Sequence, residues 1–344
     1  MASVTERLTN VLNSACVAFG VSMAKDTGIL QALMDSERPL TSQEIADNKS
    51  LKERYVREIL SSLGTAELLH MTTNEKGQLF FHLEEDDKKA LKSPLYGFIS
   101  FPLVFSPIYE QVKSCFMLEG PLGTRYTDTV HNFIDEMNVS RVDIYSSLFL
   151  EHTDELKEKL ESGIQVIEFG SGRGRLIAKL ATMFPNSTFT TSENVEKLLD
   201  LQRERWGHIP NISYKLYDLC ALPENLTEQY DWAFCVDVIH DLPKPLEALK
   251  GICNLLKAGT GVFTFIDVAS SGSPIEDKGN MSVACFYSAG SFLCIPESYQ
   301  HPDSMALGPC WGRQTAINLA TAAGFQDVKD YPADKLQRIF VCKP

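Results

Sequence analysis

The segment 166–174, Val166-Ile167-Glu168-Phe169-Gly170-Ser171-Gly172-Arg173-Gly174, places three glycines at alternate positions directly after an apolar run. Residues 176–183 then carry apolar side chains at helical spacing, so the pattern predicts a strand, a tight turn and a helix. Glycine permits positive φ and lets the backbone approach a ligand closely. The spacing differs from the Gly-x-Gly-x-x-Gly of dinucleotide sites, which argues against a nicotinamide cofactor.

Strand-like and helical stretches alternate on the carboxyl side of this segment. The apolar runs that predict strands lie at 165–169, 188–192, 212–217, 232–236, 261–267, 328–331 and 338–342. Such alternation is typical of an open, mostly parallel α/β sheet with helices on both faces. In these sheets ligands bind outside the carboxyl ends of the strands, so the candidate site lies along that edge.

Acidic residues end the two strands that follow the glycine segment. Glu193 closes the run at 188–192, and Asp218 follows the run at 212–217. A carboxylate at the first position can accept hydrogen bonds from both ribose hydroxyls of an adenosine cofactor. A carboxylate at the second can accept one from the adenine amino group. Each acidic residue alone is also compatible with a solvated surface position.

From residue 165 to 344 the chain resembles the S-adenosylmethionine (SAM)-dependent methyltransferases of the class I fold. The resemblance rests on Glu168-x-Gly170-x-Gly172-x-Gly174, Glu193, Asp218, the Tyr230-Asp231-Trp232 lead into 233–237, and Leu256-Lys257-Ala258-Gly259-Thr260. That last turn departs from the family's Leu-Lys-Pro-Gly-Gly at Ala258 and Thr260, and Thr191 replaces a frequent glycine.

This resemblance implies a Rossmann-like, mostly parallel seven-stranded sheet that binds SAM. The cofactor is a sulfonium cation with a zwitterionic amino acid tail, which suits a close backbone and nearby carboxylates better than a phosphate nest. The implied cofactor-binding residues are Glu168, Gly170, Gly172, Gly174, Glu193, Asp218, Leu219 and Asp237.

Residues 5–91 have a helical pattern that ends in a predicted hairpin around residues 73–77, which is the outline of a winged helix. Residues 1–92 hold 11 Lys and Arg against 14 Asp and Glu, a net charge of −3, and this balance argues against DNA readout. We therefore expect three parts: a winged-helix dimerisation domain at 1–92, a helical linker or lid at 93–161, and the methyltransferase domain at 162–344.

A winged-helix module ahead of a class I domain is similar to the plant-type O-methyltransferases and related small-molecule methyltransferases. In those families the module pairs two subunits, so a homodimer is expected here. The resemblance implies transfer of a methyl group to O, S or N of a small molecule, and the sequence does not name that acceptor. The alternatives left open are a non-catalytic winged-helix regulator that senses SAM and a nucleotide-dependent oxidoreductase.

Val238-Ile239-His240-Asp241 follows the predicted strand 232–236. Plant-type enzymes carry His-Asp here with the histidine as general base, and an imidazole that titrates near neutral pH suits that role. Asp267 ends the neighbouring strand and can orient the ring, so His240 and Asp267 are the candidate catalytic residues. The alternative is a loop histidine bonded to backbone. Asp241 is expected to be a helix cap or loop brace.

The segment between the strands at 261–267 and 328–331 is rich in apolar side chains, and this fold usually builds its acceptor pocket there. Tyr287 and Trp311 are the candidate substrate-binding residues, with core packing as the alternative for each.

The net charge of −13 argues against nucleic acid or an anionic membrane surface as the main partner. Nine cysteines, an odd number without any Cys-x-x-Cys, indicate neither a disulfide framework nor a zinc site. The cysteine pattern leads us to expect no bound metal. Because residues 1–20 lack the pattern of a signal peptide, we expect a cytoplasmic protein.

Overall fold

The computed structural model describes residues 2–344, which separate into two compact units. The first unit ends at Pro107 and the second spans Ile108–Pro344. The boundary falls inside helix α7 (Phe101–Cys115), so the segment 93–161 is divided between the two units.

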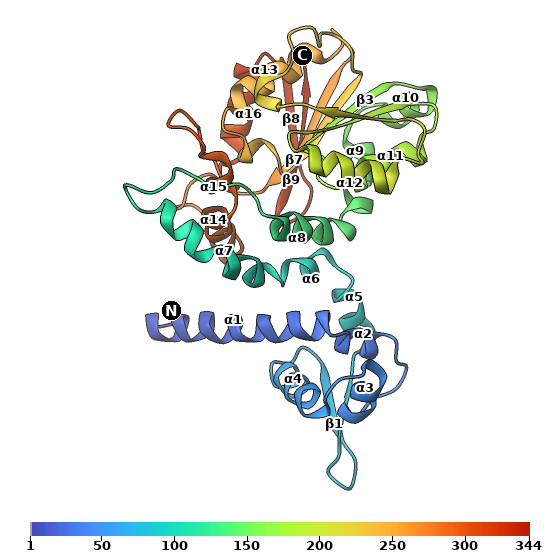
Figure 1. The fold of residues 1–344 in the computed structure, drawn as a ribbon, viewed down its shortest axis with the longest axis vertical. Coiled ribbons are helices and arrows are strands. Elements are labelled where there is room, and N and C mark those ends of the chain that lie inside the picture. The colour runs from blue at the N-terminus through green and yellow to red at the C-terminus, as the bar shows by residue number, and fades with distance from the viewer. Residues whose placement is uncertain (1) are drawn as a thin grey trace. The chain divides into compact units, whose positions relative to one another are not determined.

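The first unit consists of helices followed by a two-stranded hairpin (Figure 1). Its elements are α1 (Val4–Asp26), α2 (Ile29–Met34), α3 (Ser42–Lys49), α4 (Glu53–Thr65), β1 (His70–Thr73), β2 (Leu79–His82), α5 (Glu85–Ala90) and α6 (Pro94–Phe98). Thr41 caps α3 because its side chain accepts a hydrogen bond from the amide of Glu44, whose own side chain bonds back to the cap residue. The antiparallel pairing of β1 with β2 forms the expected wing.

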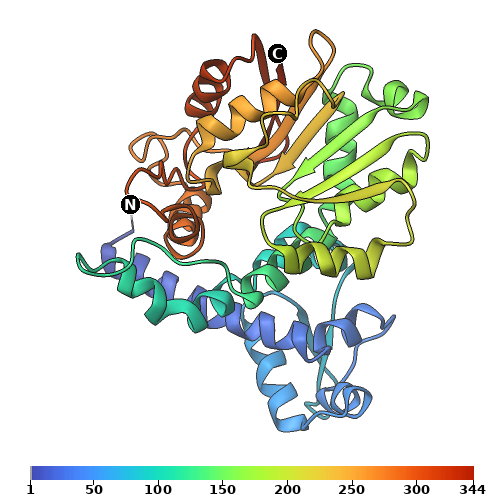
Figure 2. The same cartoon turned by 45° about the horizontal axis from the view of Figure 1, so that its top comes forward.

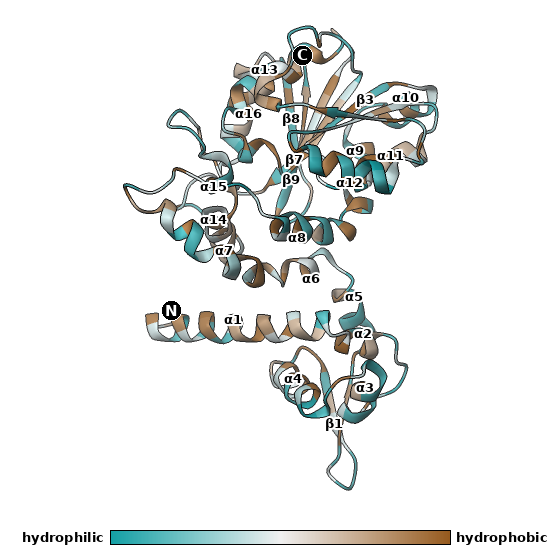
Figure 3. Cartoon of the chain, in the orientation of Figure 1, coloured by the Kyte–Doolittle hydropathy of each residue, from teal (hydrophilic) through white to brown (hydrophobic). Residues whose placement is uncertain are grey.

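The core of the first unit gathers around Leu33, Ile45 and Phe81, which are fully buried. Helix α1 contributes to this core through its second half, where Val21 and Ala24 are buried and Val17 is partly buried against them. Hydrophobic residues recur along α1, as the brown parts of this helix in Figure 3 show. Five apolar residues of the helix are exposed in the single chain: Leu8, Val11, Leu12, Phe19 and Met23. Among residues 2–344, no helix combines the length and the apolar character needed to cross a membrane.

The second unit opens with helices and continues as alternating strands and helices. Its elements after α7 are α8 (Asp128–Val139), α9 (Val142–His152), α10 (Leu156–Ser162), β3 (Gln165–Phe169), α11 (Arg175–Met183), β4 (Thr188–Glu193), α12 (Glu196–Trp206), β5 (Ile212–Leu216), β6 (Trp232–Val236), α13 (Pro245–Leu255), β7 (Val262–Val268), α14 (Met281–Phe292), α15 (Cys294–Ser298), α16 (Arg313–Ala322), β8 (Asp327–Pro332) and β9 (Gln337–Lys343). Two short 3₁₀ helices, η1 (Leu219–Ala221) and η2 (Ile239–Asp241), follow β5 and β6.

Seven strands of this unit form one sheet in the order β5-β4-β3-β6-β7-β9-β8. The first five pair in parallel. Strand β9 runs antiparallel to both β7 and β8. The predicted open, mostly parallel seven-stranded sheet is confirmed, and the carboxyl ends of β3, β4, β6 and β7 lie along one edge.

Helices cover both faces of this sheet, as Figure 2 shows. In β6, Ala233 and Cys235 face the cluster formed with α13 and α16, whereas Trp232 and Phe234 face the cluster formed with α9, α10 and α11. This alternation follows from the two-residue period of a strand. Strand β7 is buried along its whole length, as a strand covered on both faces must be.

Candidate functional site

The glycine loop after β3 adopts the backbone that its sequence predicts. Gly170, Gly172 and Gly174 have φ values of +62°, +57° and +69°, a region that side chains disfavour. A Cβ on Gly170 would lie 2.6 Å from a methyl group of Val238, while a Cβ on Gly172 would meet no atom within 4 Å. The first glycine therefore permits close packing, and the second faces open space.

Gln202, on α12, holds this loop in place. Its buried amide nitrogen donates to the carbonyl oxygen of Gly172 and to the Ser171 hydroxyl, both at 2.9 Å. Its amide oxygen accepts a 2.7 Å hydrogen bond from the hydroxyl of Thr191. Thr191, which stands where the resembling family often has glycine, is thus part of the loop's support. Sequence reasoning missed Gln202 because nothing local marks a helix residue that reaches a loop 30 positions earlier.

Two buried carboxylates lie beside the same loop. The amide of Gly172 donates a 2.5 Å hydrogen bond to Glu193 Oε1 at the end of β4. Burial raises the pKa of Glu193 to about 7. Burial, together with the nearby Glu193, raises the pKa of Glu168 well above its usual range. Within residues 2–344 no hydrogen bond reaches the buried Glu168 Oε2, so this oxygen is left for a donor from outside the protein.

Asp218 and Leu219 lie where β5 gives way to η1. The side chain of Asp218 caps η1 by accepting a 2.9 Å hydrogen bond from the amide of Cys220. Leu219 is buried and packs in the cluster that includes Ile239 and Leu249. The structure therefore places Asp218 at the expected strand end, with one carboxylate oxygen used to shape the turn.

Asp237 follows β6 and has a positive φ of +53°, which stores strain in a residue that is not glycine. Its carboxylate lies 3.2 Å from a guanidinium nitrogen of the buried Arg141 and accepts a 3.0 Å hydrogen bond from the amide of Gln337. The Tyr145 hydroxyl donates to Gln337 at 2.8 Å. Neither Arg141 nor Gln337 was identified from the sequence, since each lies about a hundred residues from Asp237.

The structure brings His240 and Asp267 together, as the sequence analysis expects. His240 Nδ1 lies 2.7 Å from Asp267 Oδ1, and only 3% of His240 and 1% of Asp267 is exposed. The same oxygen accepts a 2.7 Å hydrogen bond from the amide of Val268. Burial lowers the pKa of His240, but the carboxylates of Asp267 and Asp241 outweigh burial and raise it well above its usual range.

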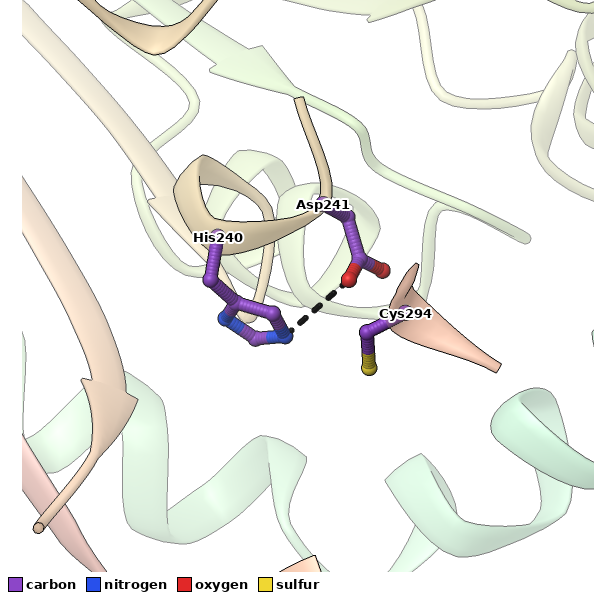
Figure 4. A group of neighbouring side chains, drawn as sticks. All are labelled: His240, Asp241 and Cys294. Atoms are coloured by element: carbon purple, nitrogen blue, oxygen red, sulfur yellow. Dashed lines mark ion pairs between the residues drawn. The ribbon is translucent and has the colours of Figure 1, made fainter. Parts of the chain in front are cut away.

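Three further side chains surround the other ring nitrogen. His240 Nε2 lies 3.2 Å from Asp241 Oδ1, and the hydroxyl of Tyr126 donates a 2.7 Å hydrogen bond to Asp241 Oδ2. Cys294, the first residue of α15, lies beside His240 and Asp241, as Figure 4 shows. Burial raises the pKa of its thiol to about 12, and the Asp241 carboxylate adds to this. Asp241 thus braces the loop, as expected, and also contacts the candidate base.

The two candidate acceptor-binding residues lie in different surroundings. Tyr287 is on α14 and 38% exposed. Trp311 is buried in the cluster behind β7, with its ring 6.4 Å from that of Phe265. The structure therefore leaves Tyr287 accessible and gives Trp311 a packing role.

Comparison with known families agrees with this architecture. Residues 15–89 match the model described as an Rv2258c-like winged HTH domain, and residues 160–294 match the model described as a methyltransferase domain. No curated protein matches the chain by sequence comparison.

Solved methyltransferase structures share the fold over nearly the whole chain. Human N-acetylserotonin methyltransferase, in complex with SAM, has a TM-score of 0.67 at 15% identity, covering 99% of this chain and 98% of its own. The mitomycin 7-O-methyltransferase MmcR has a TM-score of 0.69 at 16% identity, with coverage of 99% and 98%. An O-methyltransferase family protein from Burkholderia thailandensis has a TM-score of 0.67 at 12% identity, with coverage of 100% and 98%. The chain therefore combines an N-terminal winged helix-turn-helix domain with a methyltransferase domain of the class I fold.

Proposed function

We propose that this protein is a SAM-dependent methyltransferase that methylates O, S or N of a small molecule by in-line transfer. The observation that carries the proposal is the short contact between the Gly172 amide and Glu193, which joins the glycine loop of β3 to the acidic end of β4. The contact forms a cradle at the carboxyl edge of the sheet, where ligands of this fold class bind. The matches to methyltransferases, one of them in complex with SAM, support the same assignment.

The cradle's chemistry fits this cofactor. Open space at Gly172 accommodates an atom in contact with the backbone. The unpartnered Glu168 Oε2 suits the ammonium group of the methionine tail. Glu193 suits the ribose hydroxyls and Asp218 the adenine amino group. The remaining positions proposed to line the site are Gly170, Gly174, Leu219 and Asp237.

His240, in its neutral form, is proposed as the base that takes the acceptor's proton on Nε2, and its raised pKa makes that form a stronger proton acceptor. As the methyl group leaves the sulfonium sulfur for the acceptor atom, the acceptor loses its proton to His240 and S-adenosylhomocysteine is released. Asp267, bound to Nδ1, fixes the ring and stabilises the imidazolium that forms. Tyr287 is proposed to contact the acceptor, and the buried Trp311 to support the acceptor's pocket by packing behind it.

Gly172→Asp is expected to abolish SAM binding in isothermal titration calorimetry, because its side chain would enter the open space of the cradle. The matched control is Gly259→Asp. Gly259 also has a positive φ of +69° and open space around it, but it precedes β7 at the opposite edge of the sheet, so SAM binding should persist. Unaltered affinity in Gly172→Asp would contradict the cofactor's placement. If the unchanged protein bound neither SAM nor S-adenosylhomocysteine below millimolar concentration, the proposed function itself would fall.

SAM affinity is expected to fall roughly tenfold between pH 8 and pH 6. Glu193 must lose its proton before it binds the ribose hydroxyls, and the ionised fraction of a carboxyl group falls by about a factor of ten for each pH unit below its pKa. Burial raises the pKa of Glu193 to about 7, and hydroxyl donors bind its ionised form better. The other titratable group beside it is Glu168, whose pKa is raised well above its usual range by burial and by Glu193, so the Glu193→Gln variant is needed to isolate the contribution of Glu193. Calorimetry across this range should show a much flatter profile in Glu193→Gln. A flat profile in the unchanged protein would rule out Glu193 as the ribose ligand.

With a hydroxyl acceptor, His240→Ala is expected to lower kcat by about 10²–10⁴-fold, the usual contribution of a general base, while the Kd for SAM stays nearly the same. Asp267→Asn should cost less, because this residue only orients the ring. The control is His208→Ala, an exposed histidine of the same unit. Turnover is measured with acceptors found by screening phenols, thiols and amines with radiolabelled SAM. A mild effect on a phenol acceptor would assign His240 to loop structure.

A homodimer formed through the N-terminal unit is proposed as the working state. The support is α1, on which Leu8 and Leu12 are 66% and 63% exposed in the single chain. One turn of helix separates these two residues, so they form one apolar stripe.

Light scattering is expected to give twice the mass of a single chain, and the double variant Leu8→Glu with Leu12→Glu should give the mass of one. The double variant Asn10→Glu with Asn13→Glu adds the same charge at exposed polar positions of α1, away from the stripe, and should stay dimeric. A monomeric unchanged protein at micromolar concentration would refute the dimer.

A further inference from the structure

Three side chains of different chemistry converge beside the loop after β6. The ring nitrogen of His240, a carboxylate oxygen of Asp241 and the sulfur of Cys294 all lie within 4.8 Å of one another, and Figure 4 shows the three side chains next to one another. Nitrogen, oxygen and sulfur in this combination are ligands that Zn²⁺ accepts in proteins. Tetrahedral coordination at bond lengths of 2.0–2.3 Å needs ligand atoms about 3.3–3.8 Å apart, which a small side-chain rotation supplies.

The atoms behind these ligands are already held by the protein. Asp267 binds His240 Nδ1 at 2.7 Å, which turns Nε2 toward Asp241 and Cys294. Tyr126 donates to Asp241 Oδ2 at 2.7 Å, while no well-aligned hydrogen bond within residues 2–344 reaches the buried Asp241 Oδ1. A histidine whose second nitrogen binds a carboxylate is the usual arrangement at a metal centre.

The local charge also favours a cation. Asp241 and Asp267 both contact the His240 ring. Arg125, which precedes Tyr126 in the chain, is already paired with Glu297 at 2.8 Å. A bound divalent ion would offset the charge of these two carboxylates.

We propose that His240 Nε2, Asp241 Oδ1 and Cys294 Sγ form a site for a thiophilic divalent cation of the Zn²⁺ class, with a fourth position open. On binding, the thiol proton and the proton that an imidazolium carries on Nε2 pass to solvent, so that the sulfur bonds the metal as thiolate and the nitrogen bonds it through its lone pair.

Occupation of this site has a consequence for the reaction, which rests on the proposed function. Nε2 has one lone pair, so His240 cannot bind a metal and take the acceptor's proton at the same time. The metal-bound protein is thus unable to use His240 as a base. Zinc therefore inhibits methyl transfer to those acceptors that must lose a proton. The glycine loop and Glu193 are not part of the metal site, so SAM still binds.

The test is metal binding by the full chain. Equilibrium dialysis with elemental analysis should find one Zn²⁺ per chain at micromolar concentration. Titration with Co²⁺ should give the near-ultraviolet absorption band of a thiolate–Co²⁺ bond. Cys294→Ala should remove that band and weaken Zn²⁺ binding by more than the ~10–100-fold that loss of an outer partner costs. Asp267→Asn, which removes such an outer partner, should weaken it within that range.

The matched control is Cys310→Ala, because Cys310 is a buried cysteine of the second unit that lies outside the three-residue cluster. It should keep both the stoichiometry and the absorption band. Cys294→Ser and Asp241→Asn serve as further variants should Cys294→Ala fail to fold, which thermal unfolding reveals. Zinc binding that is unaffected by all three cluster variants, or absent from the unchanged protein, overturns the site.

SAM calorimetry separates this inference from the proposed function. If Zn²⁺ binds through Cys294 while SAM does not bind, the metal site stands and the methyltransferase assignment fails. If SAM binds and Zn²⁺ does not, the metal site alone is refuted. Once a methyl acceptor has been found, the rate of methyl transfer by each variant is measured with Zn²⁺ and with a metal chelator. Zn²⁺ should lower this rate far more in the Cys310→Ala control than in Cys294→Ala.

Discussion

A sheet covered by helices on both faces has almost no place for a charged side chain except near the ends of its strands. In this protein β6 and β7 are buried between two apolar clusters, and a carboxylate held in such an interior is costly unless something balances it. Glu193, Asp237 and Asp267 accordingly lie at or just beyond carboxyl ends. Because the strands are parallel, these ends share one edge, and the chemistry of the molecule is concentrated there.

The parts of this design that depend on local pattern could be predicted. The glycine spacing after residue 169 indicated the loop, and the alternation of strands and helices indicated a mostly parallel sheet. The position of Asp267 one strand away from His240 indicated that the two would meet, which the 2.7 Å contact bears out. Each of these inferences needs only the period of an element and the rule that neighbouring parallel strands end together.

The parts that were missed are held by contacts between distant segments. Tyr126 reaches Asp241 across 115 residues, and Arg141 reaches Asp237 across 96. Cys294 approaches His240 from a helix that begins 54 positions later, so no ligand-spacing rule could mark it. A tyrosine, an arginine or a cysteine in a helical stretch has many possible partners, and only the tertiary fold selects one. The sequence identified the strand ends and left their partners undetermined.

The position of β9 between β7 and β8 has a consequence for how the protein is made. β8 leaves the ribosome before β9, yet it joins the sheet only through β9. The edge of β7 therefore stays unpaired while about 70 more residues are synthesised, which takes roughly 4–14 s. During the same time Asp237 lacks its hydrogen bond from Gln337, while Arg141, synthesised earlier, can already offset its charge. An unpaired strand edge recruits other chains. The nascent polypeptide is thus most vulnerable to misassembly in those seconds.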